Sequence, residues 1–227
     1  MLHADPQAAV AGSEPRLHTI VCGVDGLATG REAMRQAAAV AGPDGHVEVV
    51  AVTPAPGHPQ FLPLPNAAAE ALAEAERIAA SLGVTATSRA VSSASVARAL
   101  SSAAAGADLV VVGCREVQTA HGVALGPVIE PLLAIAPCSV LVARRPPDLP
   151  LFDVIVVAED DSPHDEATTA ARLANEHGAA TRVVTSAAAV NAAAAIGCGL
   201  IVTADGPHAT RLAREAPCSV LIVRESR

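Results

Sequence analysis

The six residues APCSVL at positions 136–141 recur letter for letter at positions 216–221, and this repeat decides how the chain is organised. Each copy continues through two apolar residues to an arginine, Arg144 in the first copy and Arg224 in the second. Upstream of each copy, the apolar runs 108–113 and 200–203 also correspond, and each is followed by a turn and a stretch with helical spacing. An internal repeat of this kind predicts that one supersecondary unit occurs twice.

The first unit, residues 18–145, alternates β-branched runs with alanine-rich stretches. Short runs bounded by Gly, Pro or Asp predict strands, and apolar residues at helical spacing predict helices. The predicted strands are 19–24, 47–53, 84–91, 109–113 and 139–143. The predicted helices are 31–41, 67–82, 95–105 and 122–136. Because the strands are apolar on both faces, this order predicts an α/β fold with an open parallel sheet and helices on both faces.

The second unit, residues 151–227, follows a proline-rich linker at 146–150 and lacks one strand and one helix. Its predicted strands are 154–157, 182–185, 200–203 and 219–223. Aligning residues 181–186 with 87–92 places the deletion at the segment that matches 47–82. On that alignment residues 187–204, whose length approaches a membrane span, form a helix followed by a strand.

Composition excludes several classes of partner and site. The formal net charge is −8, whereas nucleic-acid affinity depends on clustered Lys and Arg. The chain also has no Trp or Tyr to stack on bases. Its five cysteines contain no C-x-x-C pair, a usage typical of the reducing cytoplasm. Residues 1–17 have no basic start followed by an apolar stretch, so we expect a disordered tail and no signal peptide. These features predict a cytoplasmic protein with neither nucleic acid nor membrane as partner.

The strand and helix order, together with VDG at 24–26, VVVG at 110–113 and APCSVLV at 136–142, resembles the universal stress protein family. The resemblance covers 18–145 well and 152–224 in abbreviated form. It implies an adenine nucleotide alpha hydrolase-like fold with strand order 3-2-1-4-5, pairing as dimers or tandem fusions, and a soluble stress-response protein of the cytoplasm. Some members bind ATP. Their phosphates lie in a G-x2-G-x9-G-S/T loop after the fourth strand, and an Asp after the first strand contacts the adenosine.

Open parallel sheets hold ligands at the carboxyl ends of their strands, where the winding reverses. The resemblance therefore implies a crevice between the first and fourth strands. The candidate nucleotide-contacting residues are Asp25, Val52, Gly113, Arg115 and Gly126.

Two residues of this loop depart from the family pattern. Glu116 replaces the middle glycine and adds a negative charge where polyphosphate approaches, while Arg115 compensates in part. Pro127 replaces the Ser/Thr and removes a hydroxyl and a backbone donor. We therefore expect ATP binding to be weak or lost. In the second unit residues 203–207 lead almost directly into the last helix, so we expect no nucleotide there.

Several of these residues also have structural explanations. Asp25 before Gly26 is equally typical of a turn. Thr29 followed by Glu32 fits a capping box at the start of a helix. The acidic run 159–166 suggests a divalent metal site, but Ser162 as N-cap with acidic residues in the first helical turn explains it better. The proline-rich stretch 53–65 is a flexible loop, a lid or a docking segment.

The cysteines give little sign of chemistry. Cys138 and Cys218 each open a strand after Ala-Pro and are expected in the core. Cys114, in the candidate loop, has the one plausible redox role.

No spacing of His, Ser, Cys or acidic residues matches a metal site or a nucleophile elbow. We therefore expect no catalytic residue, no metal and no enzyme activity, and fold likeness alone does not establish activity. The leading hypothesis is a non-enzymatic universal stress protein-like molecule. It acts in the stress response through a protein partner or self-association, with the second unit as a built-in dimer partner. The alternative is an ATP- or AMP-binding regulatory switch that uses the first unit's crevice.

Overall fold

A computed structural model describes residues 17–55, 66–115, 117–119, 122–144, 150–159 and 165–224. The expected N-terminal tail, the linker 146–150, most of the proline-rich stretch 53–65 and the middle of the acidic run lie almost wholly outside these ranges. Glu116 and Ser162 also lie outside them.

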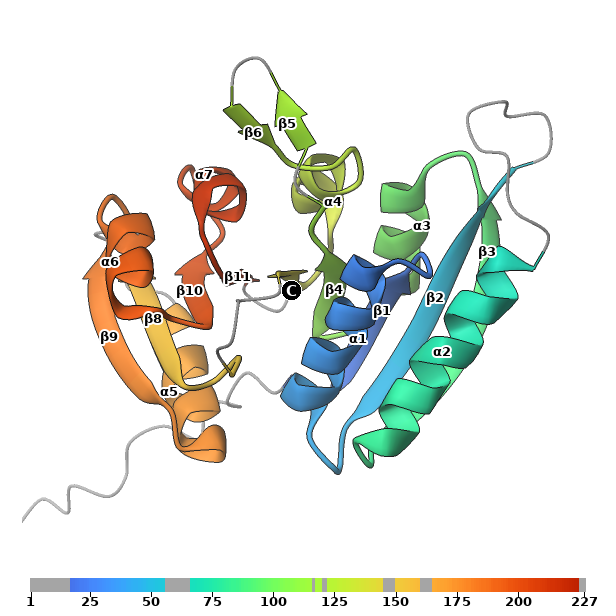
Figure 1. Cartoon of the computed structure of the whole chain (residues 1–227), viewed down its shortest axis with the longest axis horizontal. Helices are drawn as coiled ribbons and strands as arrows, with labels where there is room; N and C mark the ends of the chain where they lie inside the picture. Colours follow the sequence, from blue (N-terminus) through green and yellow to red (C-terminus); the bar gives the residue numbers. More distant parts are fainter. Residues whose placement is uncertain are drawn as a thin grey trace, which may run out of the picture.

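In the described part, nine strands form one continuous sheet (Figure 1), and two short strands form a separate hairpin. The strands are β1 Thr19–Val24, β2 His46–Pro54, β3 Thr85–Ser93, β4 Leu109–Gly113, β5 Val117–Thr119, β6 Gly122–Ala124, β7 Ser139–Ala143, β8 Val154–Glu159, β9 Ala180–Thr185, β10 Leu200–Ala204 and β11 Ser219–Val223. The helices are α1 Ala28–Ala41, α2 Ala67–Ser81, α3 Val96–Ala103, α4 Ile129–Ile135, α5 Glu166–His177, α6 Ala189–Ile196 and α7 Ala209–Glu215.

The sheet order β3-β2-β1-β4-β7 in the first unit confirms the predicted 3-2-1-4-5 arrangement, and every pair in it is parallel. In the inner strands, alternate residues enter different cores, whereas the edge strands β3 and β9 have no buried residue. Leu109 and Val111 lie in the core covered by α1, α2 and α5. Val110 and Val112 lie in the core covered by α3, α4, α6 and α7. This double burial explains why the strands are apolar on both faces.

The second unit continues the sheet as β11-β10-β8-β9 and lacks one strand and one helix, as predicted. The position of the gap differs from the sequence alignment. β9 pairs directly with β8, in the place that β2 occupies beside β1. The second unit therefore has no counterpart of the outer strand β3. Residues 187–204 form the expected helix and strand, α6 and β10.

Three local predictions are wrong. Ser162 is not the N-cap of the helix that follows the acidic run, because α5 begins at Glu166 and its N-cap is Asp165. The helix predicted at 122–136 begins only at Ile129, because residues 122–124 form β6. The capping box at Thr29 does not form, because α1 already begins at Ala28 and its N-cap is Leu27. Thr29 instead lies inside the first turn of α1.

The two copies of APCSVL meet at the junction of the units. β7 and β11 pair antiparallel with Leu141 opposite Leu221, whereas the other described pairs of the large sheet are parallel. Both strands are buried along their whole length. Each of the two hydrophobic cores therefore runs through both units without a break.

The arginine that follows each copy reaches into the other unit. Arg144 donates from its guanidinium to the carbonyl of Ala213 and, over 3.4 Å, to that of Arg214, at the end of α7. Arg224 donates to the carbonyls of Leu133 and Ala136, at the end of α4. The last carbonyls of a helix have no partner within the helix, so each arginine caps the final helix of the opposite unit.

The serine of each APCSVL copy accepts a hydrogen bond from the backbone of the other unit. The backbone N–H of Arg144 donates to Ser219 Oγ over 3.0 Å, and that of Arg224 donates to Ser139 Oγ over 3.1 Å. Gln36 of α1 adds a contact in one direction: its amide donates to the Arg144 carbonyl over 2.7 Å, and its oxygen accepts from the Ser219 hydroxyl over 2.8 Å. The polar groups at the buried junction are thus largely paired across it.

Replacing Arg144 tests how strongly this junction holds the fold. Arg144→Ala leaves helix-end carbonyls of α7 without their donor inside a buried region, so we expect the free energy of unfolding to fall by about 2–4 kcal/mol. Urea denaturation followed by circular dichroism measures the change.

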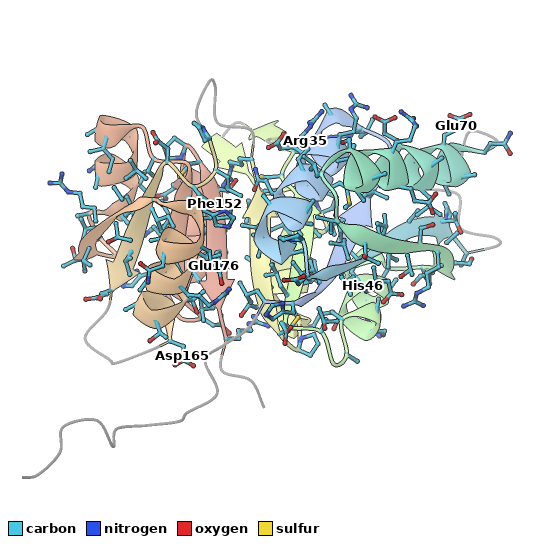
Figure 2. The ribbon with its side chains drawn as sticks, turned by 90° about the horizontal axis from the view of Figure 1, so that it is seen from below. Arg35, His46, Glu70, Phe152, Asp165 and Glu176 are labelled. Atoms are coloured by element: carbon cyan, nitrogen blue, oxygen red, sulfur yellow. The ribbon has the colours of Figure 1, made fainter. Side chains whose placement is uncertain are left out.

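Arg35→Ala is the matched control. Arg35 lies on the outer surface of α1 (Figure 2), where its side chain is 52% exposed and pairs with Glu32 at 3.3 Å. Removing such an exposed pair changes stability by less than about 1 kcal/mol. Equal losses in the two variants would contradict a special role for Arg144.

Candidate functional site

The fold brings together the sequence-predicted residues at the carboxyl ends of three neighbouring strands. Val24 at the end of β1 is opposite Ala51 of β2, and Gly23 is opposite Val112 of β4. Asp25, Val52 and Gly113 therefore follow at one edge of the sheet, at the switch point where such sheets hold ligands.

Asp25 is engaged in its own turn. Its Oδ1 accepts a hydrogen bond from the backbone N–H of Leu27 over 3.0 Å. Gly26 follows with a φ of 76°, in the left-handed region that favours glycine. The structure therefore shows the turn that the sequence offered as an explanation of Asp25, and its carboxylate already accepts a hydrogen bond there.

Gly113 is required by packing. A Cβ atom at this position would lie 2.3 Å from the carbonyl oxygen of Thr29, because the first turn of α1 rests directly on the end of β4. Gly126 differs, because a Cβ there would lie 3.7 Å from the carbonyl oxygen of Arg115, an ordinary contact. The structure therefore brings these two predicted residues side by side, with Gly126 buried and Arg115 exposed.

The loop that the resemblance assigns to phosphates folds as a hairpin. β5 and β6 pair antiparallel, with Val117 opposite Ala124 and Thr119 opposite Gly122. Figure 1 shows this hairpin above α4, on the side of the molecule that carries α7, and β6 contacts α7 of the second unit. Backbone N–H groups paired across a hairpin are not available to a phosphate. The predicted effect of Glu116 stays a prediction, because that residue lies outside the described ranges.

The second unit has the same turn without the hairpin. Cys114 donates its N–H to the Ala143 carbonyl over 2.8 Å, and Asp205 donates to the Val223 carbonyl over 2.9 Å. β4 pairs with β1 as β10 pairs with β8, and superposing these two registers places Ala204 at the position of Gly113.

Gly206-Pro207 of the second unit match Gly126-Pro127 of the first. Ile129 donates to the Gly126 carbonyl and Ala209 to the Gly206 carbonyl, each over 3.1 Å. Residues 115–125 therefore have no counterpart in the second unit, which agrees with the expectation that it has no phosphate loop.

The described hollows lie away from the predicted phosphate loop. One, of about 10 Å³, lies between the start of α1 and α2 and has room for roughly one water. The other, of about 280 Å³, lies between β3 and α3 and includes Arg89 and Arg98 in its lining. Neither is lined by Gly113, Arg115 or Gly126.

All five cysteines are buried, and none of them forms a disulfide. Cys138 and Cys218 lie in the core, as predicted, and Cys114 is buried as well, which argues against its redox role in an exposed loop. Burial raises the pKa of Cys22 to about 12 and that of Cys138 to about 11.

Sequence reasoning missed a contact between Cys198 and Cys218, whose Sγ atoms lie 3.1 Å apart. Cys198 precedes β10 and Cys218 precedes β11, and these two strands are neighbours in the sheet. The contact could therefore be predicted only once the strand order was known.

Among the described residues, no group of three or more His, Cys, Asp or Glu side chains is arranged to hold a metal ion. No helix in the described ranges is long and apolar enough to cross a membrane.

Comparison with known proteins agrees with the fold and the sequence resemblance. A model of the Universal stress protein family matches residues 16–144, more than half of the 227 residues. A search of curated proteins found no match.

Two solved structures are similar over almost the whole chain. A universal stress protein from Archaeoglobus fulgidus DSM 4304 gives a TM-score of 0.70 at 14% sequence identity, covering 92% of this chain and 99% of that one. A functionally unknown protein from Pseudomonas aeruginosa PAO1 gives a TM-score of 0.70 at 13% identity, covering 94% of each chain. At these identities the likeness shows the fold alone.

The two glycines of the loop pattern should respond differently to an added methyl group. Gly113→Ala forces α1 away from β4, so we expect a loss of about 1–3 kcal/mol in unfolding free energy, as for other overpacked sites. Gly126→Ala meets ordinary contact distances and should change stability by less than about 1 kcal/mol. Thermal or urea unfolding of both variants measures this difference, and an equal response would contradict the packing explanation of Gly113.

Proposed function

The chain belongs to the universal stress protein family, and from that premise we propose that it acts in the stress response without catalysis. In this proposal it works in the cytoplasm through contacts with a protein partner or with itself, and its nucleotide binding is weakened or lost. The observation that carries the proposal is the hairpin at the phosphate-loop position.

The hairpin supports weakened nucleotide binding in two ways. Its backbone groups pair with each other, so fewer N–H groups remain to approach phosphate oxygens. Its second strand also contacts α7 of the other unit, so reopening the loop means breaking a contact between the units. Asp25 points the same way, because its carboxylate already accepts the Leu27 N–H.

The second unit is best explained as a built-in partner. β11 pairs with the edge of β7 that would otherwise be open, and Arg224 caps α4 of the first unit. A unit kept for this purpose needs its last strand and last helix but not a ligand-binding crevice. That requirement fits a unit that retains the APCSVL strand and lacks both the hairpin and the outer strand.

An ATP- or AMP-binding switch is the second candidate. It is favoured by the meeting of Asp25, Val52 and Gly113 at one sheet edge, and by the exposed Arg115 beside Gly126, which supplies a cation near the crevice mouth. Cation and glycine contacts of this kind suit a phosphate.

Calorimetric titration of the purified full chain with Mg-ATP distinguishes the two candidates. The proposal predicts no heat of micromolar binding and no change in melting temperature at millimolar nucleotide. Saturation at 100 times the Kd would stabilise the fold by about 2.7 kcal/mol, a readily measured shift. Micromolar binding would overturn the claim of lost affinity and favour the switch.

A matched variant identifies the cause of the loss. Glu116→Gly combined with Pro127→Ser restores the family's loop pattern on the same fold. Binding by this variant but not by the natural chain would assign the loss to these two residues. Absence of binding in both would assign it to the hairpin.

The mass in solution tests the role of the second unit. Because β11 covers the β7 edge, we expect a single chain of 22.7 kDa at micromolar concentration. Light scattering after gel filtration measures this mass. A stable dimer would mean that another surface self-associates, and that covering β7 is not the whole role of the second unit.

A further inference from the structure

Two buried thiols of the second unit lie within reach of a covalent bond. The Sγ atoms of Cys198 and Cys218 are 3.1 Å apart, and both residues are almost fully buried. A disulfide holds its sulfurs at about 2.05 Å, so a further approach of about 1 Å would join them.

The fold itself creates this proximity. Cys198 lies between the end of α6 and the start of β10, and Cys218 lies immediately before β11. β10 and β11 are parallel neighbours with Leu200 opposite Ser219, and the Ser219 N–H donates to the Gly199 carbonyl over 3.3 Å. The backbone is therefore held in register directly beside both cysteines.

The repeat contains an internal comparison. Cys138 holds the position of Cys218 before the last strand of the first unit. The strand registers match Leu109 with Leu200, so the position of Cys198 is taken by Ala107. The thiol pair thus occurs in the second unit and not in the first, although the surrounding backbone follows the same pattern.

The contact assigns different roles to the two sulfurs. The hydrogen bond with Cys218 lowers the pKa of Cys198, although burial opposes this effect. The same bond, together with burial, raises the pKa of Cys218. Since the thiolate is the reactive form of cysteine, we take Cys198 as the attacking sulfur; either sulfur can donate in this contact, and both orders of attack give the same disulfide.

We propose that Cys198 and Cys218 form an oxidation site at which a hydroperoxide converts the two thiols into an intramolecular disulfide between β10 and β11. The Cys198 thiolate attacks the hydroperoxide, which breaks the O–O bond, giving a sulfenic acid and, after proton uptake, one molecule of water or alcohol. The Cys218 thiol then displaces hydroxide from the sulfenic sulfur, and its proton leaves with that hydroxide as water. Two electrons pass from the thiols to the peroxide.

Access depends on local opening, because Cys198 is only 3% exposed. Its segment is short and follows the eight-residue helix α6, which ends at Gly197 in the left-handed conformation. Short elements with few buried apolar residues open more readily than central strands, and α6 buries just Ala189 and Ala193. The consequence reaches the junction of the units, because the Cys218 carbonyl accepts from Arg144 over 3.5 Å.

Peptide mapping of the oxidised full chain tests the proposal. The protein is reduced, freed of reductant, treated with hydrogen peroxide under native conditions, and then alkylated in denaturant and digested with trypsin. Each of the five cysteines falls in a different tryptic peptide, Cys198 in residues 183–211 and Cys218 in residues 215–224. We expect these two peptides to appear as one linked species that dithiothreitol separates.

Two variants sharpen the result. Cys198→Ala places at this position the residue that the first unit already has there, so the fold should tolerate it, and the linked species should disappear. Cys138→Ala removes the unpaired counterpart and should leave the linked species unchanged.

Three outcomes would overturn the proposal. The first is full alkylation of Cys198 and Cys218 after peroxide treatment. The second is their separate oxidation to sulfinic acid without a link. The third is a link formed just as readily by other cysteines.

Discussion

The antiparallel pairing of β7 with β11 is the interaction on which the rest of the structure depends. Each strand presents the same APCSVL sequence, so one surface faces a second copy of itself. The exchange of Arg144 and Arg224 completes the pairing, because each arginine satisfies carbonyls at the end of the other unit's last helix. A symmetric contact between identical sequences is how a protein subunit usually meets a copy of itself. Here both copies lie in one chain.

This constraint explains why the second unit is shortened where it is. Strands β11, β10 and β8 continue the sheet from the junction, and helices α5, α6 and α7 cover its two faces. The missing strand lies at the far edge, the position that contributes least to the junction. The hairpin of the first unit has no copy in the second, and its strand β6 contacts α7. The two units therefore differ most at the far edge strand and at this hairpin.

Several residues at the crevice illustrate how packing and ligand binding compete for the same positions. Gly113 would suit a loop that approaches phosphate, yet it packs against Thr29, whose backbone leaves no room for a side chain there. Asp25 would suit a ribose, yet its oxygen completes a turn. Gly113 and Asp25 therefore have a structural role in the fold that does not depend on a ligand, although the loop that follows Gly113 folds as a hairpin.

The sequence by itself determined the repeat, most strand limits and the apolar core, because these follow from short-range periodicity and burial on both faces. The strand order of the first unit, and with it the grouping of Asp25, Val52 and Gly113, was implied by the family resemblance, and the structure confirms that order. Only the tertiary structure decided that β9 moves in beside β8, that residues 117–124 form a hairpin, and that Cys198 meets Cys218. These features depend on which strands lie side by side, and contacts between distant segments leave no periodic trace along the chain.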